Sequence, residues 1–242
     1  MGALPGPGGR PDGVHGWECE WPTGGVAERH HRDPCFDVRR VLVHEVARPT
    51  LVLGSAQRDQ RFLPEDARLQ AAGCGLVRRR SGGGGVLLRP GHVLWVDVVL
   101  PRGDVLWDDD VGCSGLWLGD VWSTVLAGLG LVADVHRGPL VGGAWSEAVC
   151  FAGRGPGEVS VDGRKVVGIS QRRTRGGTWF QCAALLEWRP RELVDLLGLE
   201  PVEQVTAELE ERAVGLVDLL AQDAPDPEEL AAAFVAALPV GD

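Results

Sequence analysis

The segment at residues 158–173, EVSVDGRKVVGISQRR, carries the clearest fold signal in the chain. Two runs of strand-forming residues flank Asp162 and Gly163, and an Asp-Gly pair tolerates the positive φ angles that both positions of a tight hairpin turn require. The segment therefore predicts an antiparallel β-hairpin. Alternation along its second strand would place Lys165 and Gly168 on opposite faces of the sheet.

Further regular elements are predicted on both sides of this hairpin. Apolar residues with strand or helix spacing mark strands at 41–46, 50–54, 74–79, 93–100 and 178–188, and helices at 64–72 and 115–129. Asp226 and Glu229 have the spacing of a capping box, which begins a helix near the end of the chain. Strands in succession, with helices between and after them, predict an α+β fold with a mostly antiparallel mixed sheet flanked by helices.

Composition divides the 242 residues into three parts. Residues 1–37 are rich in Gly, Pro and His and lack periodicity, which predicts a flexible N-terminal arm. Residues 38–190 hold the patterned strands and are expected to form the catalytic domain. Residues 191–242 are expected to form an acidic helical tail that packs on this domain. From Leu186 onward the net charge is −11, so the total of −10 leaves about +1 for the rest of the chain.

Composition also argues against several classes of protein. The six cysteines lie at least fifteen residues apart and form no CxxC pair, unlike those of a zinc ribbon or a thioredoxin-type site. No signal peptide is recognisable, and the longest uncharged apolar stretch, 121–133, is shorter than the roughly 18 residues that suggest a membrane span. The arginine clusters do not make the broad basic face of a nucleic-acid-binding protein. We therefore expect a cytoplasmic protein with reduced thiols, no metal site and no membrane or nucleic-acid partner.

A glycine-rich segment follows three arginines at residues 78–86, RRRSGGGGV. Four glycines in a row are often a flexible linker. Here they lie between a predicted strand and further apolar sequence, where their N–H groups can approach a ligand closely and the arginines can balance its negative charge. The segment is therefore interpreted as a ligand-binding loop. It is no Walker loop, because the Gly-Lys-Ser/Thr ending is missing.

Lys165 is the single lysine of a chain that has 24 basic residues. Two interpretations stay open on the residues alone. The lysine is either a chance survivor of a coding bias toward arginine, or it serves a site that needs a compact charge with three rotatable donors. Gly168, three residues further along the predicted strand, is a separate observation, because a glycine inside a strand often marks the close approach of a ligand or of another backbone.

Together these segments resemble the superfamily of lipoate–protein ligases, octanoyltransferases and biotin ligases. The first motif of the family matches at Arg78, Arg79, Ser81, Gly82, Gly83, Gly84 and Val86. The second motif matches at Gly163, Arg164, Lys165, Val166, Val167, Gly168, Ser170 and Gln171. LVLGSAQ at 51–57 is similar to the Gly-x-x-Gln strand end of the family.

The resemblance implies a biotin/lipoate ligase catalytic-domain fold and an enzyme that attaches lipoate or octanoate to the lysine of a lipoyl carrier domain. ATP and Mg²⁺ would form an acyl-adenylate, and the partners would be lipoyl domains of 2-oxoacid dehydrogenase E2 subunits or the glycine cleavage H protein. Lys165 would hold the acyl oxygen. The substrate-binding residues would be Arg78, Arg79, Ser81, Gly82, Gly83, Gly84, Gly85, Gly168, Ser170 and Gln171.

Two alternatives to the ligase stay open. Cys150 followed by Phe151 resembles the Cys-Phe placement of cysteine-dependent octanoyltransferases, whose catalytic thiolate takes an acyl group from an acyl carrier protein thioester without ATP. Cys150 could equally be a buried apolar residue. The second alternative is a non-catalytic protein that binds acyl-adenylate, because the family's aromatic-His-Asp continuation of the first motif is replaced by residues 87–89, LLR.

Overall fold

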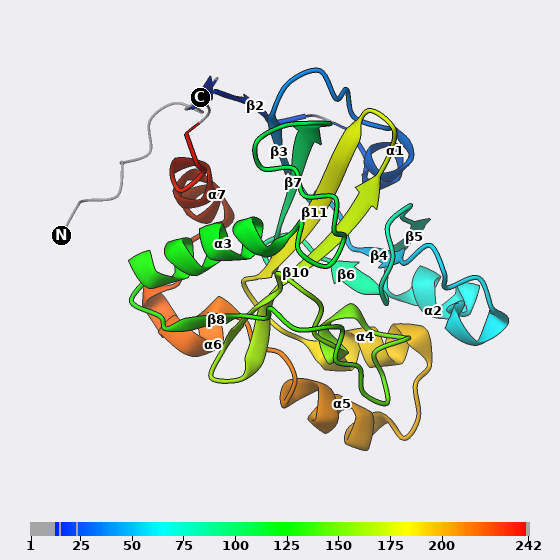
Figure 1. Ribbon diagram of the computed structural model, residues 1–242. Coiled ribbons are helices and arrows are strands. Elements are labelled where there is room, and N and C mark those ends of the chain that lie inside the picture. Colours follow the sequence, from blue (N-terminus) through cyan, green and yellow to red (C-terminus); the bar gives the residue numbers. More distant parts are fainter. Residues whose placement is uncertain (1–12, 15, 23, 241–242) are drawn as a thin grey trace.

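The fold is that of a computed structural model, which describes residues 13–14, 16–22 and 24–240 of the chain. Two sheets lie face to face with helices on their outer sides (Figure 1). The large sheet has the order β1 (Gly13–Val14), β2 (Trp17–Glu20), β3 (Arg40–His44), β7 (Val93–Pro101), β11 (Gly177–Leu185), β10 (Arg164–Arg173), β9 (Val159–Val161) and β8 (Ala133–Val135). The small sheet has the order β5 (Gly75–Arg78), β4 (Thr50–Leu53) and β6 (Val86–Leu88).

The helices cover both outer faces of this pair of sheets. They are α1 (Val26–His31), α2 (Asp66–Ala71), α3 (Leu116–Gly128), α4 (Pro190–Leu197), α5 (Val202–Glu210), α6 (Leu216–Leu220) and α7 (Pro227–Ala236), with short 3₁₀ turns at Gln60–Phe62, Cys150–Ala152 and Ala221–Asp223. The predicted α+β class and the mostly antiparallel mixed sheet are confirmed, although the strands form two sheets. None of the helices in the described part of the chain is long and apolar enough to cross a bilayer.

Strand β7 shows how the two layers share one core. Its even residues, such as Val96 and Val98, pack with Trp122 of α3 and Phe234 of α7. Its odd residue Trp95 points to the other side, toward the small sheet. Both faces of β7 are therefore buried, which explains the nearly continuous apolar sequence of this strand. The outer face of the small sheet is covered by α4 and α5 through side chains of β4.

The hairpin at 158–173 forms as predicted, with one irregularity that matters for the site. Asp162 and Gly163 have φ angles of 49° and 76°. A register shift between Lys165 and Val167 interrupts the pairing of β10 with β9. A Cβ atom on Gly168 would lie 3.3 Å from Lys165 Cε. The prediction that these two residues lie on opposite faces is wrong, because a bulge adds a residue and shifts the alternation beyond it.

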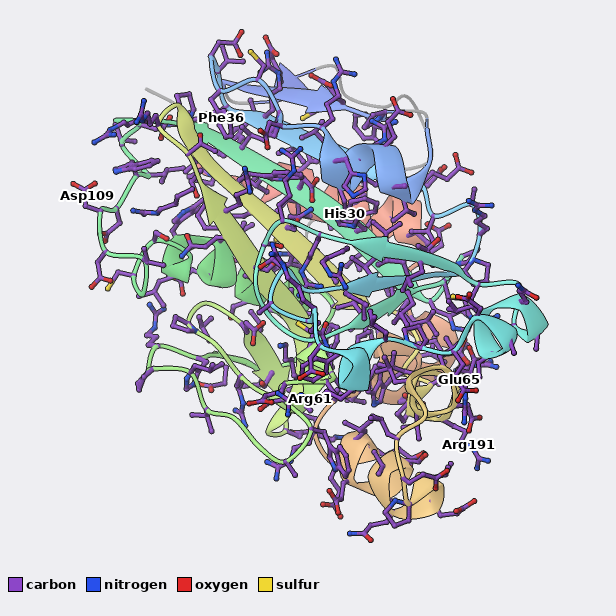
Figure 2. All side chains as sticks on the ribbon, turned by 90° about the vertical axis from the view of Figure 1, so that its right-hand side faces the viewer. His30, Phe36, Arg61, Glu65, Asp109 and Arg191 are labelled. Carbon is purple, nitrogen blue, oxygen red and sulfur yellow. The ribbon has the colours of Figure 1, made fainter. Side chains whose placement is uncertain are left out.

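The folded body begins before residue 38, which corrects the boundary expected from composition. β2 pairs in parallel with β3, its Trp17 is buried, and α1 places His30 in the interior (Figure 2). These elements are only four and six residues long, so they are too short to show a periodic pattern. Residues 1–12 of the expected arm lie outside the described part of the chain.

The segment after residue 190 joins the fold at the strand that carries Lys165. The Lys165 N–H donates to Arg212 O at 2.8 Å, and the Val214 N–H donates to Lys165 O at 3.0 Å. The predicted capping box of α7 is confirmed, since Asp226 accepts from the Glu229 N–H and the Glu229 side chain accepts from the Asp226 N–H. The acidic tail thus holds the backbone of β10 at Lys165.

Candidate active site

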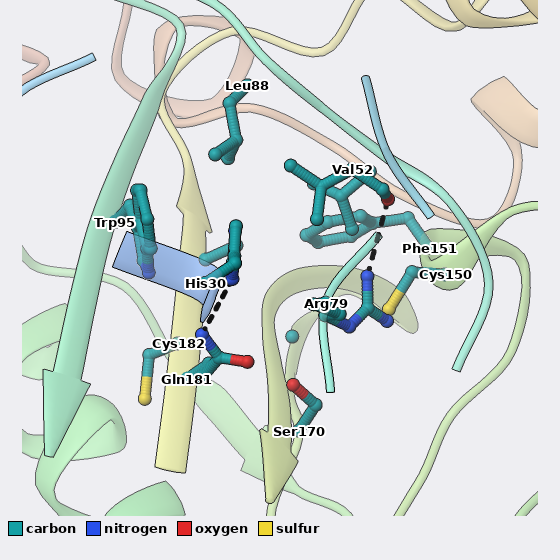
Figure 3. Close-up of a pocket in the computed structure, with 13 residues that line it drawn as sticks. His30, Val52, Arg79, Leu88, Trp95, Cys150, Phe151, Ser170, Gln181 and Cys182 are labelled. Atoms are coloured by element: carbon teal, nitrogen blue, oxygen red, sulfur yellow. Dashed lines mark hydrogen bonds between the residues drawn. The ribbon is translucent and has the colours of Figure 1, made fainter. Parts of the chain in front are cut away.

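A cavity of about 40 Å³ lies between the two sheets, beside Cys150 (Figure 3). Its apolar wall comes from strands β4, β6 and β7 and from the Cys150–Ala152 turn, with side chains of Val52, Val86, Leu88, Trp95 and Phe151. Its polar wall is formed by His30, Arg79, Cys150, Ser170 and Gln181. A pocket with one apolar wall and one polar wall that carries a cysteine sulfur suits an acyl chain with a reactive carbonyl end.

The glycine-rich loop is held in place by the buried side chain of Arg79. Its guanidinium donates to Gly82 O at 2.6 Å, to Gly84 O at 3.0 Å and to Val52 O at 3.4 Å. Burial lowers the pKa of Arg79, while its interaction with Cys150 acts in the opposite direction. Arg79 therefore organises the loop through its carbonyl oxygens. The Gly85 N–H donates to Ala148 O at 2.8 Å, so the N–H groups that a ligand could use are those of Gly82, Gly83 and Gly84.

Glycine is required where this loop touches neighbouring backbone. A Cβ atom on Gly84 would lie 2.6 Å from Val149 C, and one on Gly54 would lie 1.7 Å from Gly83 O. Gly85 and Cys150 are joined by a hydrogen bond from the Cys150 N–H to Gly85 O at 3.0 Å. The close approach of the loop to Val149 thus sets where the Cys150 sulfur lies.

Replacing Gly84 by alanine is expected to lower both stability and acyl transfer, because the new methyl group clashes with the backbone of Val149. Overpacking of this kind costs about 1–3 kcal/mol, which for a chain of this size corresponds to a melting-temperature decrease of roughly 2–10 °C. Thermal unfolding measures the effect. Gly82→Ala is the matched control, since a Cβ atom there has no neighbour within 4 Å. Equal melting temperatures for the two variants would contradict the proposed close approach.

Cys150 is partly exposed at the first position of the Cys150–Ala152 turn. Its sulfur lies beside the Arg79 guanidinium, and a Cβ atom on Gly83 would sit 3.7 Å from Sγ (Figure 3). A neighbouring cation and access to the cavity are the two conditions that a nucleophilic cysteine needs. Cys182 also lines the cavity, but burial raises the pKa of its thiol far above the usual range, so it remains protonated.

Lys165 is buried next to this cysteine, at 2% exposure. Its ammonium group forms an ion pair with Glu158 Oε2 at 2.6 Å and donates to Cys150 O at 2.9 Å and to Gly153 O at 3.1 Å. An ammonium group has three N–H donors, so all of them are engaged with the protein. Direct contact of Lys165 with an acyl oxygen, as the resemblance implies, therefore requires one of these bonds to be exchanged.

Glu158 is a site residue that the sequence analysis missed. Besides Lys165, its carboxylate accepts from the Gly155 N–H at 2.6 Å and from the Ile169 N–H at 3.1 Å. A buried charge needs a partner and further hydrogen bonds. Glu158 directly precedes β9 in the hairpin that carries Lys165, and this proximity was the one signal that could have identified it.

A chain of hydrogen bonds joins the two motifs of the sequence across the cavity. Ser81 Oγ lies 3.0 Å from Ser170 Oγ and donates to Gln181 Oε1 at 2.7 Å. Gln181 Nε2 lies 3.0 Å from His30 Nδ1. Ser81 and Ser170 thus come together as the resemblance implies, whereas Gln181 and His30 were not expected in the site.

Of the residues expected to bind substrate, Arg79, Gly168 and Ser170 line the cavity, whereas the side chains of Arg78 and Gln171 bond to neighbouring loops. Arg78 donates to Gln57 O at 2.8 Å and supports the turn after β4. Gln171 accepts from Ser114 Oγ at 2.6 Å and donates to Val111 O at 2.8 Å. Neither residue lines the cavity, because each side chain is engaged with a neighbouring loop. Gln57 instead ties the Gly54 turn to the segment before Cys150, donating to Ala148 O at 3.1 Å.

The cationic side chains around the glycine-rich loop form ion pairs or hydrogen bonds with acceptors of the protein. Arg80 pairs with Asp33 at 2.6 Å and Lys165 with Glu158, while Arg79 donates to carbonyl oxygens. A triphosphate would have to compete with these acceptors. Among residues 16–22 and 24–240, no three His, Cys, Asp or Glu side chains come together in a way that could hold a metal ion.

A family model for the lipoyl protein ligase A/B catalytic domain matches residues 28–239, which is most of the chain. The chain belongs to this family. The match begins within α1 and ends after α7, so the family's catalytic domain includes both the His30 helix and the helical tail. The resemblance inferred from the two motifs is thereby confirmed.

Two curated relatives of this chain are octanoyltransferases. The chain is 35% identical over 184 residues to the octanoyltransferase LipM of Kyrpidia tusciae, covering 71% of this chain and 64% of that protein. It is 33% identical over 145 residues to the octanoyl-[GcvH]:protein N-octanoyltransferase of Geobacillus kaustophilus, covering 60% of this chain and 46% of that protein. The chain therefore spans about half to two thirds of the length of these relatives.

Solved structures of lipoate–protein ligases share the fold. The bi-partite lipoate protein ligase of Thermoplasma acidophilum superposes with a TM-score of 0.71 at 17% identity, over 93% of this chain and 82% of that one. A lipoate-protein ligase A bound with ATP superposes with a TM-score of 0.59 at 18% identity, over 82% and 70%. At these identities the likeness concerns the fold alone. The predicted biotin/lipoate ligase catalytic-domain architecture is confirmed.

Proposed function

We propose that this chain is a cysteine-dependent acyltransferase, which takes an octanoyl or lipoyl group from a carrier and attaches it to the lysine of a lipoyl domain. The observation that carries the proposal is the position of Cys150, whose sulfur opens into an apolar cavity beside Arg79 and the glycine-rich loop. The two octanoyltransferases among its relatives support the same reading. The adenylate-forming ligase favoured by the motifs alone is the less well supported alternative.

The proposed reaction has two balanced steps. In the first, the Cys150 thiolate attacks the carbonyl carbon of a carrier thioester, the carbon–sulfur bond to the carrier breaks, and the carrier thiol leaves with a proton. In the second, the neutral amine of the acceptor lysine attacks the acyl-Cys150 thioester, which gives an amide and regenerates the Cys150 thiol. No oxidant, nucleotide or metal is needed for this balance.

The residues around Cys150 have distinct tasks in this scheme. Free N–H groups of the glycine-rich loop stabilise the oxyanion that forms on the carbonyl oxygen in both steps. Arg79 keeps the loop in shape and places a positive charge beside the Cys150 sulfur. Lys165 holds the carbonyl groups of Cys150 and Gly153, so it fixes the turn that presents the sulfur.

The form of acyl donor that the protein accepts distinguishes a transferase from a ligase. We expect intact-mass analysis to detect octanoylation of a lipoyl domain when the protein is incubated with an octanoyl thioester of acyl carrier protein, without ATP. A parallel incubation with free octanoate, ATP and Mg²⁺ is expected to yield little product. A third incubation, with octanoyl glycine cleavage H protein, tests the donor named for the Geobacillus relative. Product only in the ATP incubation would contradict the proposal and support the ligase.

A further inference from the structure

One wall of the cavity comes from a residue outside the two sheets. His30 lies on α1, is 3% exposed, and its ring stacks on the indole of Trp95 with centroids 4.6 Å apart (Figure 3). Trp95 is itself fixed, because His44 stacks on it at 4.0 Å and its N–H donates to Asp97 Oδ1 at 2.7 Å. The imidazole therefore occupies a defined place inside the cavity.

Hydrogen bonding determines the protonation of this imidazole. Ser81 donates to Gln181 Oε1, so the amide nitrogen of Gln181 is turned to His30 Nδ1 and donates to it. The proton of the neutral ring must then be on Nε2. Burial lowers the pKa of His30 to about 4, which keeps the ring neutral at physiological pH. Within the described residues, no protein atom is hydrogen-bonded to Nε2, although this atom is buried.

The size of the cavity makes His30 decisive for any acyl ligand. At about 40 Å³ the cavity holds only a few water molecules, so the position of each wall decides how much of an acyl chain it can take. Most other walls are side chains of paired strands in the core between the sheets. The helix that carries His30 is only six residues long and is fastened at its end, where Arg80 pairs with Asp33 at 2.6 Å and also holds His31 O at 2.5 Å. The fastened helix holds the imidazole at this place in the cavity wall, so the ring limits the room for a chain.

We propose that His30 is the specificity-determining residue for the acyl chain, because a chain that enters the cavity beside Cys150 meets its ring in the cavity wall and longer chains are excluded by it. The proposal rests on the proposed acyltransferase function. The polar N–H at Nε2 adds to the steric limit, since extra methylene groups packed over it would keep water from this donor. Pockets that discriminate by a methylene group reach ratios of roughly 10- to 200-fold.

The test is the chain-length preference of the His30→Ala variant. S-acylation of Cys150 by hexanoyl, octanoyl and dodecanoyl pantetheine is followed by intact protein mass for the wild type, His30→Ala and His30→Phe. We expect the dodecanoyl-to-octanoyl rate ratio to rise about tenfold or more in His30→Ala. We expect His30→Phe, which keeps a ring of similar reach, to stay near the wild-type ratio. His31→Ala is the matched control, because this neighbouring side chain is exposed.

A second measurement separates this proposal from the function on which it rests. Calorimetry gives the affinities of octanoyl and dodecanoyl pantetheine analogues in which a methylene group replaces the thioester sulfur, so that no transfer can occur. A shifted affinity ratio in His30→Ala without Cys150 acylation in any protein would support the length-setting role and contradict the transferase. A folded His30→Ala variant with wild-type ratios in both measurements would overturn the role of His30. Failure of the wild type to bind either analogue would overturn both.

Discussion

Replacing Cys150 by alanine is expected to abolish acyl transfer from a thioester donor, with a loss on the order of 10³ or more. The reason is that the proposed route forms a covalent bond to this sulfur, and alanine has no nucleophile to replace it. The side chain is small and partly exposed, so the variant is expected to fold. The measurement is the rate of lipoyl-domain octanoylation, together with the mass of the enzyme after incubation with the donor alone.

The wild-type enzyme should gain one octanoyl group, mapped to the peptide that contains Cys150 and not to Cys182. Cys113→Ser is a suitable control, because Cys113 is an exposed thiol of the loop before α3 and does not line the cavity. Full turnover in Cys150→Ala would exclude the covalent route. The adenylate-forming route, which needs no enzyme thiol, would then account for the activity.

The hairpin and the glycine-rich loop could be predicted because their signals are local. Asp162 and Gly163 encode their turn through backbone conformations that few other residues tolerate. Gly84 is needed because it contacts the backbone of Val149, 65 residues away in the chain. This requirement for a residue without a side chain still appears in the sequence as a glycine. The glycine-rich loop, the long helix α3 and the paired strands around β7 could all be predicted from such signals.

Other parts of the site depend on contacts that no local pattern encodes. The bulge beside Lys165 leaves no mark in the alternation of apolar residues, so the strand was assigned the wrong face for this lysine. His30 lies in a helix too short to show a period, and its role depends on Gln181, which is 151 residues away. In the sequence, Glu158 is an ordinary polar residue before a strand. Only the burial of Lys165 shows that this lysine needs the carboxylate as a partner.

The contacts of Lys165 indicate that it acts by holding the turn that carries Cys150. Three acceptors, from Glu158, Cys150 and Gly153, surround the ammonium group at 2.6–3.1 Å. A tetrahedral group with three donors fits such an arrangement. Lys165→Ala would leave Glu158 buried without a partner, which costs about 3–5 kcal/mol and would confuse unfolding with loss of catalysis. Arginine is the more informative replacement, because it keeps the positive charge.

We expect Lys165→Arg to fold but to lose acyl transfer about a hundredfold, which is the order of loss caused when a reacting group is displaced by about 1 Å. A guanidinium group is longer and planar, so it cannot serve the same acceptors without moving the turn that carries Cys150. Thermal unfolding checks the fold, transfer from an octanoyl thioester measures the rate, and Arg164→Ala is the control on the neighbouring, partly exposed position. Near-normal transfer by a folded Lys165→Arg would mean that any cation suffices here. The single lysine would then reflect codon usage, and the position of the Cys150 sulfur would have to be fixed by Arg79 and the glycine-rich loop alone.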